Sequence, residues 1–346
     1  MSEVLEYKCP ACGGTLAFDA DSQKMKCPYC DSEFEVTEAK AAQPGSIALE
    51  QKPTGEMSDV VSYSCPSCGG EIIGDANFVA TRCPFCGNTA IISTRLAGVL
   101  RPDLVIPFAI NKDAAKEALK NFYRGKILMP GEFASENKIE DITGIYVPYW
   151  LFDCEAGGSV EYNATRVTMW QDRKFRYTKT DYYRVYRDGK VSFERVPVDG
   201  SKKMPDDYME AIEPFDYSGM MAFDTPYLAG YAADKYDVSA DESIPRVHER
   251  LKNTLLDLFG QTVNGYSGVT PTRTNLHFSH HTVKYALLPV WILNSVYRGT
   301  TYMYAMNGQT GRFAGRLPVS WGRFWAWFLG MFAGLGAIGT LIVMLL

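Results

Sequence analysis

The sequence lacks the motifs of several large enzyme classes. It contains no nucleotide-binding P-loop, no His-Glu-x-x-His zinc-protease motif and no Gly-x-Ser-x-Gly nucleophile elbow. Its one histidine cluster, His277-Phe-Ser-His280-His281, has no cysteine or acidic pattern beside it, which is typical of solvated or edge-strand residues. We therefore predict a protein that is not an enzyme. An enzyme with its site in the central part of the chain is the less favoured alternative.

Positive charge is also scarce. The 346 residues contain 35 Lys and Arg against 40 Asp and Glu, which gives a formal net charge of −5. Non-specific affinity for nucleic acid comes mainly from lysines and arginines that release the counterions of phosphates. The charge balance therefore disfavours general nucleic-acid binding, although it is compatible with a local basic patch.

An apolar leader is absent as well. The first ten residues, MSEVLEYKCP, are acidic and polar, unlike a secretory signal. We therefore expect a reducing compartment, in which a disulfide framework does not persist. Hydrophobic residues make up 46% of the chain and charged residues 22%, which is ordinary globular composition and excludes a collagen or a disordered protein.

Paired cysteines are the strongest signal that the sequence does contain. Eight of its 9 cysteines stand in Cys-x-x-Cys pairs, and 14 residues separate the two pairs of each set. Such a knuckle presents two thiolates to one ion, and two knuckles complete a closed tetrahedral site of the kind that structural Zn²⁺ occupies. We predict two structural Zn²⁺ ions, one held by Cys9, Cys12, Cys27 and Cys30 and the other by Cys65, Cys68, Cys83 and Cys86.

Two other chemistries use paired cysteines. Rubredoxin-type iron has identical ligands, and residue spacing does not separate Fe from Zn. Redox pairs like that of thioredoxin require a βαβ setting, which a series of four pairs does not indicate. The ninth cysteine, Cys154, lies in an apolar strand pattern and is predicted to be a small core residue.

The first predicted ribbon is acidic. Residues 1–36 hold seven Asp and Glu against three Lys, and a zinc ion with four thiolates adds two negative charges. A phosphate backbone finds little attraction there, so we expect the ribbons to bind protein or to be purely structural. A membrane-tethered zinc-ribbon protein that binds nucleic acid is the alternative.

The chain divides into five predicted parts, and we expect an α+β fold. The segment between the ribbons is rich in Ala, Gln, Gly, Pro and Ser, which predicts a flexible tether. The parts are zinc ribbon 1 (1–36), a flexible linker (37–59), zinc ribbon 2 (60–94), an α+β domain (100–316) and a transmembrane tail anchor (324–346).

The central domain mixes helix and strand signals. One helix is predicted to be capped by Asn111, and a second begins at the capping box of Ser239 or just after Pro245. The dipeptides Asp188-Gly189 and Asn307-Gly308 favour positive φ and predict tight hairpin turns between strands.

A weak internal repeat runs through the same domain. The segment Tyr146-Val-Pro-Tyr-Trp150-Leu-Phe-Asp153 is similar to Leu287-Leu-Pro-Val-Trp291-Ile-Leu-Asn294, and each copy has a predicted helix upstream. We infer two related lobes, each a helix followed by strands. Trp150 and Trp291 would then occupy equivalent core positions.

The last part of the chain is a long apolar run. Residues 324–346 carry no charge and as a helix would extend about 34 Å, enough for a hydrocarbon core of roughly 30 Å. The positive-inside rule then predicts a single-pass protein of the cell membrane with its N-terminal body in the cytoplasm. The predicted anchor residues are the interfacial Trp321, Arg323, Trp325 and Trp327, and Gly330 and Gly334, whose small-residue stripe favours a homo-oligomer.

These features together resemble a known family. The chain is similar to the bacterial TFIIB-type zinc-ribbon membrane proteins of the YdjG-like group. Besides the knuckles, the motifs that carry this resemblance are Val105-Ile-Pro-Phe108, Ile145-Tyr-Val-Pro-Tyr-Trp150, Val196-Pro-Val-Asp-Gly-Ser201, Ala211-Ile-Glu-Pro214, Tyr227-Leu-Ala-Gly-Tyr231 and Leu288-Pro-Val-Trp291. One knuckle departs from the pattern, because Asp31 stands where the other three have Gly.

The resemblance implies a function that residue spacing alone does not. It implies a non-enzymatic, tail-anchored adaptor that works beside an SPFH (flotillin-like) protein and a PspA-like envelope-stress protein at the cytoplasmic membrane face. The eight knuckle cysteines are the positions that the resemblance marks as functional, and it implies no catalytic residue.

Overall fold

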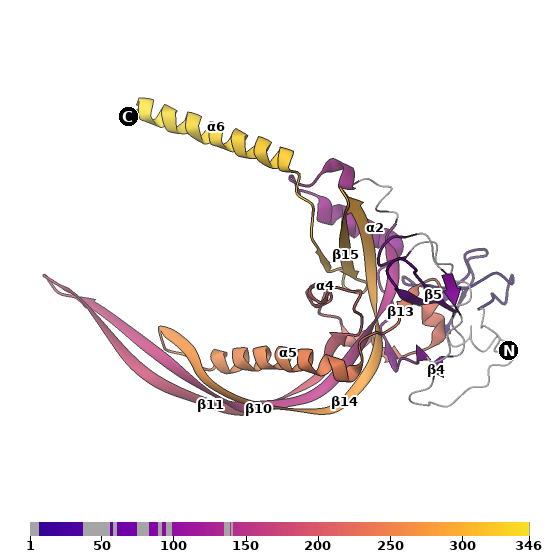
Figure 1. The fold of residues 1–346 in the computed structure, drawn as a ribbon, viewed down its shortest axis with the longest axis horizontal. Helices are drawn as coiled ribbons and strands as arrows, with labels where there is room; N and C mark the ends of the chain where they lie inside the picture. The colour runs from indigo at the N-terminus through magenta and orange to yellow at the C-terminus, as the bar shows by residue number, and fades with distance from the viewer. Residues whose placement is uncertain are drawn as a thin grey trace. The chain divides into compact units, whose positions relative to one another are not determined.

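The computed structural model describes residues 7–36, 56–57, 61–74, 83–88, 92–94, 99–134, 139 and 141–345. The fold is mixed α+β, as predicted, and the chain forms two compact units (Figure 1). Unit 1 consists of Met1–Pro148, Ser201–Lys235 and Leu287–Leu346, and unit 2 of Tyr149–Gly200 and Tyr236–Ala286. Most of the predicted linker, 37–55 and 58–60, lies outside the described residues.

Short strands build most of unit 1. Ribbon 1 is a three-stranded antiparallel sheet in the order β1-β2-β3, and β4 pairs with β8. The main sheet has the order β12-β9-β14-β10-β13-β6-β5-β7, with β15 beside β14 and β16 beside β15. The short strands are β1 (Ala17–Asp19), β2 (Lys24–Lys26), β3 (Glu33–Phe34), β4 (Glu56–Met57), β5 (Val61–Ser64), β6 (Glu71–Gly74), β7 (Ile92–Thr94), β8 (Val99–Leu100), β9 (Leu104–Val105), β12 (Met221–Ala222), β13 (Ala232–Asp234), β15 (Thr300–Asn307) and β16 (Phe313–Gly315).

Ribbon 2 is part of this main sheet. Its strand β6 pairs antiparallel with β13, with Ile73 opposite Ala233. The Lys235 ammonium lies 2.9 Å from the Glu71 carboxylate at the same junction. Ribbon 2 is therefore not a separate tethered module, because its backbone hydrogen bonds continue into the strands of the central domain.

The helices of unit 1 follow the local signals. In α2 (Lys112–Tyr123) the Asn111 side chain accepts a hydrogen bond from the Ala114 N–H at 2.8 Å, which confirms the predicted cap. The helix buries Leu119 and ends just before Gly125, whose φ is +78°. The other short helices are η1 (Gly131–Ala134), α4 (Asp206–Ala211), η2 (Tyr217–Gly219) and η3 (Thr225–Leu228).

Unit 2 is built on long strands. It contains most of β10 (Thr143–Gln171) and β14 (Gly268–Tyr297), all of β11 (Arg176–Asp199), and the helix α5 (Ala240–Gln261). Both halves of the Ser239 capping box are present, so α5 starts there, with Pro245 inside the helix. The helix packs against β11 and buries Val247, Leu251, Leu255 and Phe259.

One predicted turn is wrong. Asp188-Gly189 lies inside β11. This strand pairs with β10 from the pair of Tyr149 and Asp199 to the pair of Gln171 and Arg176, with no turn between them. Gly189 stands opposite Gly158, where an added Cβ would come within 2.0 Å of the Asn275 carbonyl oxygen. Gly158 therefore admits the close approach of β14, whereas a Cβ on Gly189 would meet the Phe259 ring of α5 at 3.3 Å. The long antiparallel ladder outweighs the turn preference of the dipeptide.

The repeat is visible in two matched hydrogen bonds. In unit 2 the Trp150 indole N–H donates to the Val238 carbonyl at 2.9 Å, one residue before the N-cap of α5. In unit 1 the Trp291 indole N–H donates to the Ile110 carbonyl at 2.9 Å, one residue before the N-cap of α2. The equivalent positions predicted for the two tryptophans are confirmed.

A glycine completes the match. The Gly200 carbonyl accepts from the Val238 N–H at 3.1 Å, and the Gly308 carbonyl accepts from the Ile110 N–H at 2.9 Å. Each glycine follows the strand that pairs with the tryptophan strand. In each unit the helix therefore begins on the end of a two-strand ladder, held by one indole and one glycine.

The two copies of the repeat exchange their helices. In the chain, α2 precedes the copy that contains Trp150, and α5 precedes the copy that contains Trp291. In the structure α2 joins Trp291, and α5 joins Trp150. Each lobe is therefore assembled from one helix and the strands of the other copy.

The predicted span forms the helix α6 (Trp321–Leu345), and Leu346 lies outside the described residues. Across the described part of the chain, no helix combines the length and the apolar character needed to cross a membrane. The structure thus gives no support to the predicted transmembrane helix.

The repeat predicts a cost for losing one indole. Trp291→Phe removes the donor to the Ile110 carbonyl at a buried position, so unfolding by urea, followed by circular dichroism, should show a loss of about 1–3 kcal/mol. The control Trp170→Phe changes a half-exposed indole and should leave stability within about 0.5 kcal/mol. Equal unfolding midpoints for the two variants would contradict the assigned role.

Candidate metal centres

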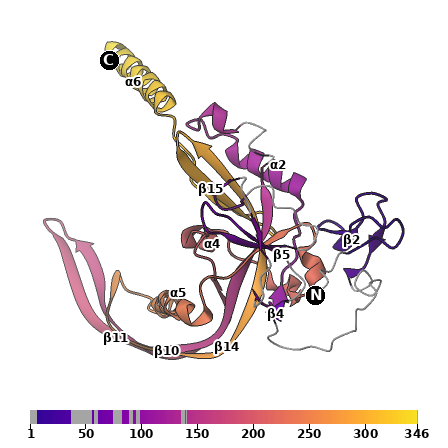
Figure 2. The same ribbon diagram turned by 45° about the vertical axis from the view of Figure 1, so that its right-hand side comes forward.

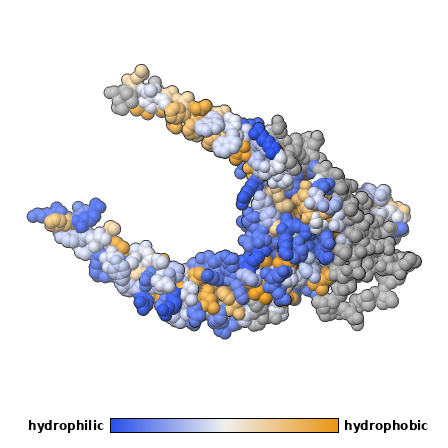
Figure 3. All heavy atoms as spheres, in the orientation of Figure 1, coloured by the Kyte–Doolittle hydropathy of each residue, from blue (hydrophilic) through white to orange (hydrophobic). Residues whose placement is uncertain are grey.

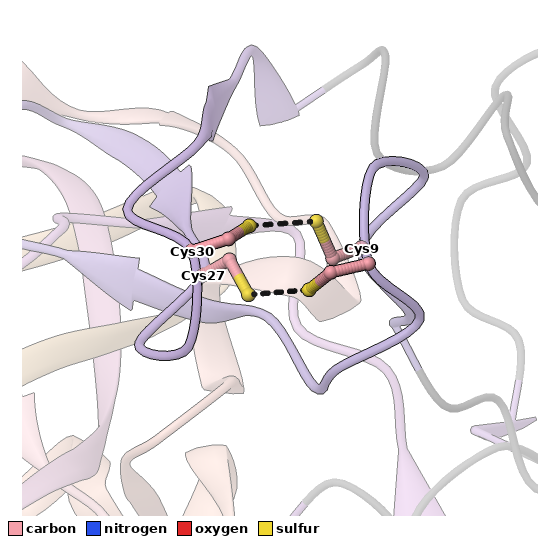
Figure 4. A group of neighbouring side chains, drawn as sticks. Cys9, Cys27 and Cys30 are labelled. Carbon is pink, nitrogen blue, oxygen red and sulfur yellow. Dashed lines mark hydrogen bonds between the residues drawn. The ribbon is translucent and has the colours of Figure 1, made fainter.

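Four sulfur atoms converge in each predicted site. In ribbon 1 the Cys9 and Cys30 sulfurs are 3.6 Å apart and the Cys12 and Cys27 sulfurs 3.5 Å (Figure 4). In ribbon 2 the matching distances are 3.6 Å for Cys65–Cys86 and 3.7 Å for Cys68–Cys83. Within each set all four sulfurs lie within 4.8 Å of one another.

These distances fit a tetrahedral ion. With Zn–S bonds of about 2.3 Å, the edge of an ideal tetrahedron of sulfurs is about 3.8 Å. Four thiolates also leave no ligand position open, which is the arrangement of structural rather than catalytic zinc. The geometry is therefore compatible with one Zn²⁺ in each ribbon, bound by the residues that the spacing predicts.

The knuckles share one backbone pattern. The Cys27 N–H donates to the Ser32 carbonyl at 3.0 Å, and the Asp31 N–H donates back to the Cys27 carbonyl at 2.9 Å. The other three knuckles repeat this pair of hydrogen bonds. The residue after the second cysteine has a positive φ in each, +56° at Asp31 and +69° to +75° at Gly13, Gly69 and Gly87. Asp31 thus adopts a conformation in which an L side chain is strained.

Hydrogen bonds and burial act on the thiols in opposite directions. The Ser32 hydroxyl, 3.3 Å from the Cys30 sulfur, and the Ser32 backbone N–H lower the pKa of the Cys30 thiol to about 6. Burial raises the pKa of Cys83. In ribbon 2 the backbone N–H groups of Cys68 and Ser67 outweigh burial and lower the pKa of the Cys65 thiol to about 7, so each ribbon contains a thiol that ionises readily near neutral pH.

An aromatic ring packs on a glycine in both ribbons. A Cβ on Gly14 would lie 2.5 Å from the Tyr29 ring, and a Cβ on Gly70 would lie 2.6 Å from the Phe85 ring. This contact was not among the predictions from the sequence. Its signal is the Gly-Gly that follows Cys12 and Cys68, together with an aromatic residue inside each second knuckle.

The surroundings of the two ribbons differ. The second knuckle of ribbon 2 is buried, with Phe85 only 7% exposed, and the Asn294 amide donates to the Pro84 carbonyl and, at 2.8 Å, to the Phe85 carbonyl. The corresponding Tyr29 of ribbon 1 is 77% exposed. Asn294 ends the second repeat segment, so a repeat residue holds the knuckle of ribbon 2 in place.

Ribbon 1 also contacts the rest of unit 1, but through fewer bonds. The Gln23 amide donates to the Phe108 carbonyl at 2.7 Å, and the Phe18 N–H donates to the Ala229 carbonyl at 3.0 Å. The Phe18 and Tyr227 rings meet edge to face with centroids 5.2 Å apart. These contacts use β1 and the β1–β2 turn and leave both knuckles of ribbon 1 accessible.

Comparison with known proteins identifies the family. A protein of Bacillus subtilis (strain 168), YdjG, is 34% identical over 331 residues, which are 96% of this chain and 95% of that protein. The chain belongs to the YdjG family. No protein-family model matches it, and no solved structure does. Membership agrees with the resemblance read from the motifs and is silent on zinc, partners and activity.

The ninth cysteine of this YdjG-family chain is a core residue. Cys154 is buried in β10, opposite Phe193, and burial raises the pKa of its thiol to about 11. It lies in unit 2 and belongs to neither sulfur cluster. The prediction of a small packed side chain is confirmed.

The predicted anchor residues all lie in α6, with different surroundings. Arg323 was predicted to lie at the membrane interface. In the structure its guanidinium donates a hydrogen bond to the Met129 carbonyl at 2.5 Å. A Cβ at Gly330 or Gly334 would meet no atom within 4 Å, so the small-residue stripe packs against nothing described. The three tryptophans are exposed side chains: Trp321, Trp325 and Trp327.

Metal content tests both sites. Elemental analysis of the purified full-length protein should find about two Zn per chain, and Cys65→Ser with Cys68→Ser should reduce this to about one. The matched control Cys154→Ser removes a cysteine outside the clusters and should retain both ions. Iron in protein produced with both metals present would contradict the assignment to zinc.

The glycine contacts predict unequal effects of the same substitution. Gly70→Ala forces the buried Phe85 ring to move and should cost about 1–3 kcal/mol and speed zinc loss to a chelator. Gly14→Ala meets Tyr29, which can swing into solvent, and should cost less than about 1 kcal/mol. Melting temperature and chelator-induced zinc release measure the difference, and a larger effect at Gly14 would refute it.

Proposed function

We propose that this YdjG-family protein is a non-enzymatic adaptor that α6 holds at the cytoplasmic face of the cell membrane. Two structural Zn²⁺ ions stabilise its ribbons, and ribbon 1 recruits partner proteins. The proposed partners are SPFH (flotillin-like) and PspA-like envelope-stress proteins, which the family resemblance suggests. The observation that carries the proposal is the apolar surface of α6.

The helix α6 exposes its large apolar side chains around its circumference. Figure 3 shows this helix largely in the colours of hydrophobic residues. A contiguous apolar surface of this length is unfavourable in water and calls for a cover, which lipid supplies without a specific partner. The exposed side chains beyond the tryptophans are Phe328, Leu329, Met331, Phe332, Leu335, Ile338, Ile342 and Met344.

The sulfur clusters support a role without catalysis. A catalytic zinc keeps one position for water or substrate, whereas four thiolates fill all positions of a tetrahedral ion. Each ribbon is too small to fold on an apolar core alone, so metal binding supplies the folding energy. The ions then act by shaping a surface, which is the task of an adaptor.

Ribbon 1 supplies the recruiting surface in this proposal. The knuckle at Pro28–Asp31 is exposed, and Tyr29 stands at its centre. Exposed tyrosines are frequent anchors of protein interfaces, since the ring buries a large area at little entropic cost. Acidic residues lie in and just after this knuckle in the chain, which favours a partner with a basic patch: Asp31, Glu33 and Glu35.

The nucleic-acid alternative finds less support in ribbon 1. Lys24 lies 3.0 Å from the Glu35 carboxylate, and Lys26 lies 3.7 Å from that of Asp31. The positive charges of these two lysines are thus balanced by neighbouring carboxylates. Nucleic-acid phosphates would have to compete with those carboxylates for the lysines. A basic stripe across the ribbon, which nucleic-acid binding requires, is replaced by an acidic surface.

The test uses vesicles that carry the full-length protein and a purified PspA-like or SPFH-like protein. Co-flotation should show partner binding that Tyr29→Ser weakens at least about tenfold, as for an interface anchor. Tyr182→Ser, which alters an equally exposed tyrosine (81% against 77%), should leave binding unchanged. Deletion of Phe324–Leu346 should leave the protein unattached to vesicles of phosphatidylcholine alone, which are the vesicles used here.

Two results would overturn the proposal. Partner binding that is insensitive to Tyr29→Ser would remove ribbon 1 from the recruiting surface. Flotation with phosphatidylcholine vesicles that persists after deletion of Phe324–Leu346 would remove α6 from the anchor.

A further inference from the structure

The hairpin of β10 and β11 ends in a two-stranded tip within unit 2. The last bonds between β14 and this hairpin are the Ser267 N–H to the Thr165 carbonyl at 2.7 Å and the Val167 N–H to the Ser267 hydroxyl at 3.0 Å. Beyond them β10 and β11 continue alone, past the start of β14 and the end of α5 (Figures 1 and 2). We call residues 169–177 the hairpin tip.

Large apolar side chains are exposed on this tip. Met169, Trp170, Phe175 and Tyr177 are between 39% and 67% exposed. Trp170 and Tyr177 stand opposite each other in the ladder, and their rings stack with centroids 5.4 Å apart and planes 12° apart. Phe175 meets Tyr177 at 6.4 Å, so three aromatic rings form one surface.

The turn of the tip does not need this surface. The Asp172 N–H donates to the Phe175 carbonyl at 3.0 Å, and the Asp172 carboxylate accepts from the Lys174 N–H at 2.8 Å and the Phe175 N–H at 2.7 Å. The Tyr177 hydroxyl donates to the same carboxylate at 2.9 Å. Backbone and carboxylate bonds thus close the loop, with the Tyr177 hydroxyl among the donors, and none of these bonds involves the side chain of Trp170 or Phe175.

Cations surround the aromatic surface. Arg173, Lys174 and Arg176 lie in or next to the loop, and in the described part of the chain none of them forms an ion pair. Lys179, farther down the strand, differs because it lies 3.0 Å from the Asp181 carboxylate. The one acidic residue of the tip is Asp172, whose oxygens face the loop's own donors. A chain of net charge −5 thus presents a cationic end at this hairpin.

We propose that the hairpin tip binds the surface of an anionic phospholipid bilayer. Trp170 and Phe175 enter the interfacial layer, where aromatic rings are favoured, and the three cations contact lipid phosphates. A stable protein interface uses about 20–30 residues on each side, more than this narrow tip offers. A bilayer demands no matched shape, so a few aromatic and cationic side chains are enough.

This inference goes beyond the proposed function. An anchor made of apolar side chains, such as α6, does not distinguish one lipid headgroup from another. The tip adds selectivity for anionic lipid, and it belongs to unit 2, whereas α6 belongs to unit 1. The two membrane contacts can therefore be tested separately in the same full-length chain.

Oxidative footprinting of the full-length protein on vesicles provides the test. The probes are vesicles of phosphatidylcholine alone and vesicles that also contain phosphatidylglycerol, and mass spectrometry measures side-chain oxidation. Oxidation of residues 169–177 should fall at least about threefold on the anionic vesicles only, because the interfacial layer excludes water from the rings. Tyr182 and Tyr186, exposed on the same hairpin, are the internal controls and should stay equally oxidised.

A charge-reversed variant separates lipid binding from a general change of surface. Arg173→Glu with Lys174→Glu and Arg176→Glu should abolish the protection, since each cation near an anionic surface contributes about fivefold to affinity. The matched control reverses three exposed cations of unit 2 away from the tip: Arg184→Glu, Lys252→Glu and Arg273→Glu. This control changes net charge equally and should keep the tip protected.

Each outcome decides between the two membrane contacts. Flotation with both vesicles and protection on anionic vesicles alone supports the tip and the α6 anchor together. Flotation with both and no protection overturns the tip and leaves the anchor. Flotation with anionic vesicles only, lost on charge reversal, supports the tip and overturns the anchor. No flotation, or protection that the charge-reversed variant retains, overturns the lipid-binding tip.

Discussion

The convergence of four thiolates on one point is the constraint on which the N-terminal half of unit 1 depends. Sulfurs held 3.5–3.7 Å apart repel one another once ionised, and a divalent ion at their centre would turn that repulsion into the force that closes the ribbon. In ribbon 2 the effect would reach farther, because β6 forms backbone bonds with β13. A metal ion held by Cys65, Cys68, Cys83 and Cys86 would therefore support a sheet and not merely a loop.

The same motif serves two different settings in this chain. Both ribbons pack an aromatic ring on a glycine and close each knuckle with the same backbone bonds. Ribbon 2 is fastened by Asn294 and buries its ring, whereas ribbon 1 exposes Tyr29 and contacts unit 1 mainly through Phe18 and Gln23. The same arrangement of four cysteines thus occurs in one ribbon whose second knuckle is buried and in one whose second knuckle is exposed.

Local signals in the sequence predicted local structure well. The ligand sets, the cap at Asn111, the capping box at Ser239 and the matched tryptophans all depend on residues close in sequence or on a repeated pattern. Non-local choices were not predictable. Asp188-Gly189 has the composition of a turn, yet the long ladder of β10 and β11 runs through it, and Gly189 lies beside the Phe259 ring of α5. The pairing of β6 with β13 and the exchange of helices between the repeats have no signal in the local amino-acid composition.

The exchange of helices between the repeats sets the order in which the two units can fold during translation. Unit 2 comes from two nearby stretches of chain, so its helix can meet its strands while the rest is still being made. Unit 1 is different, since α2 waits for Trp291 and Gly308, some 180 residues later in translation. Those residues are followed closely in the chain by α6, so the contact that fixes the start of α2 forms only shortly before the apolar helix is made.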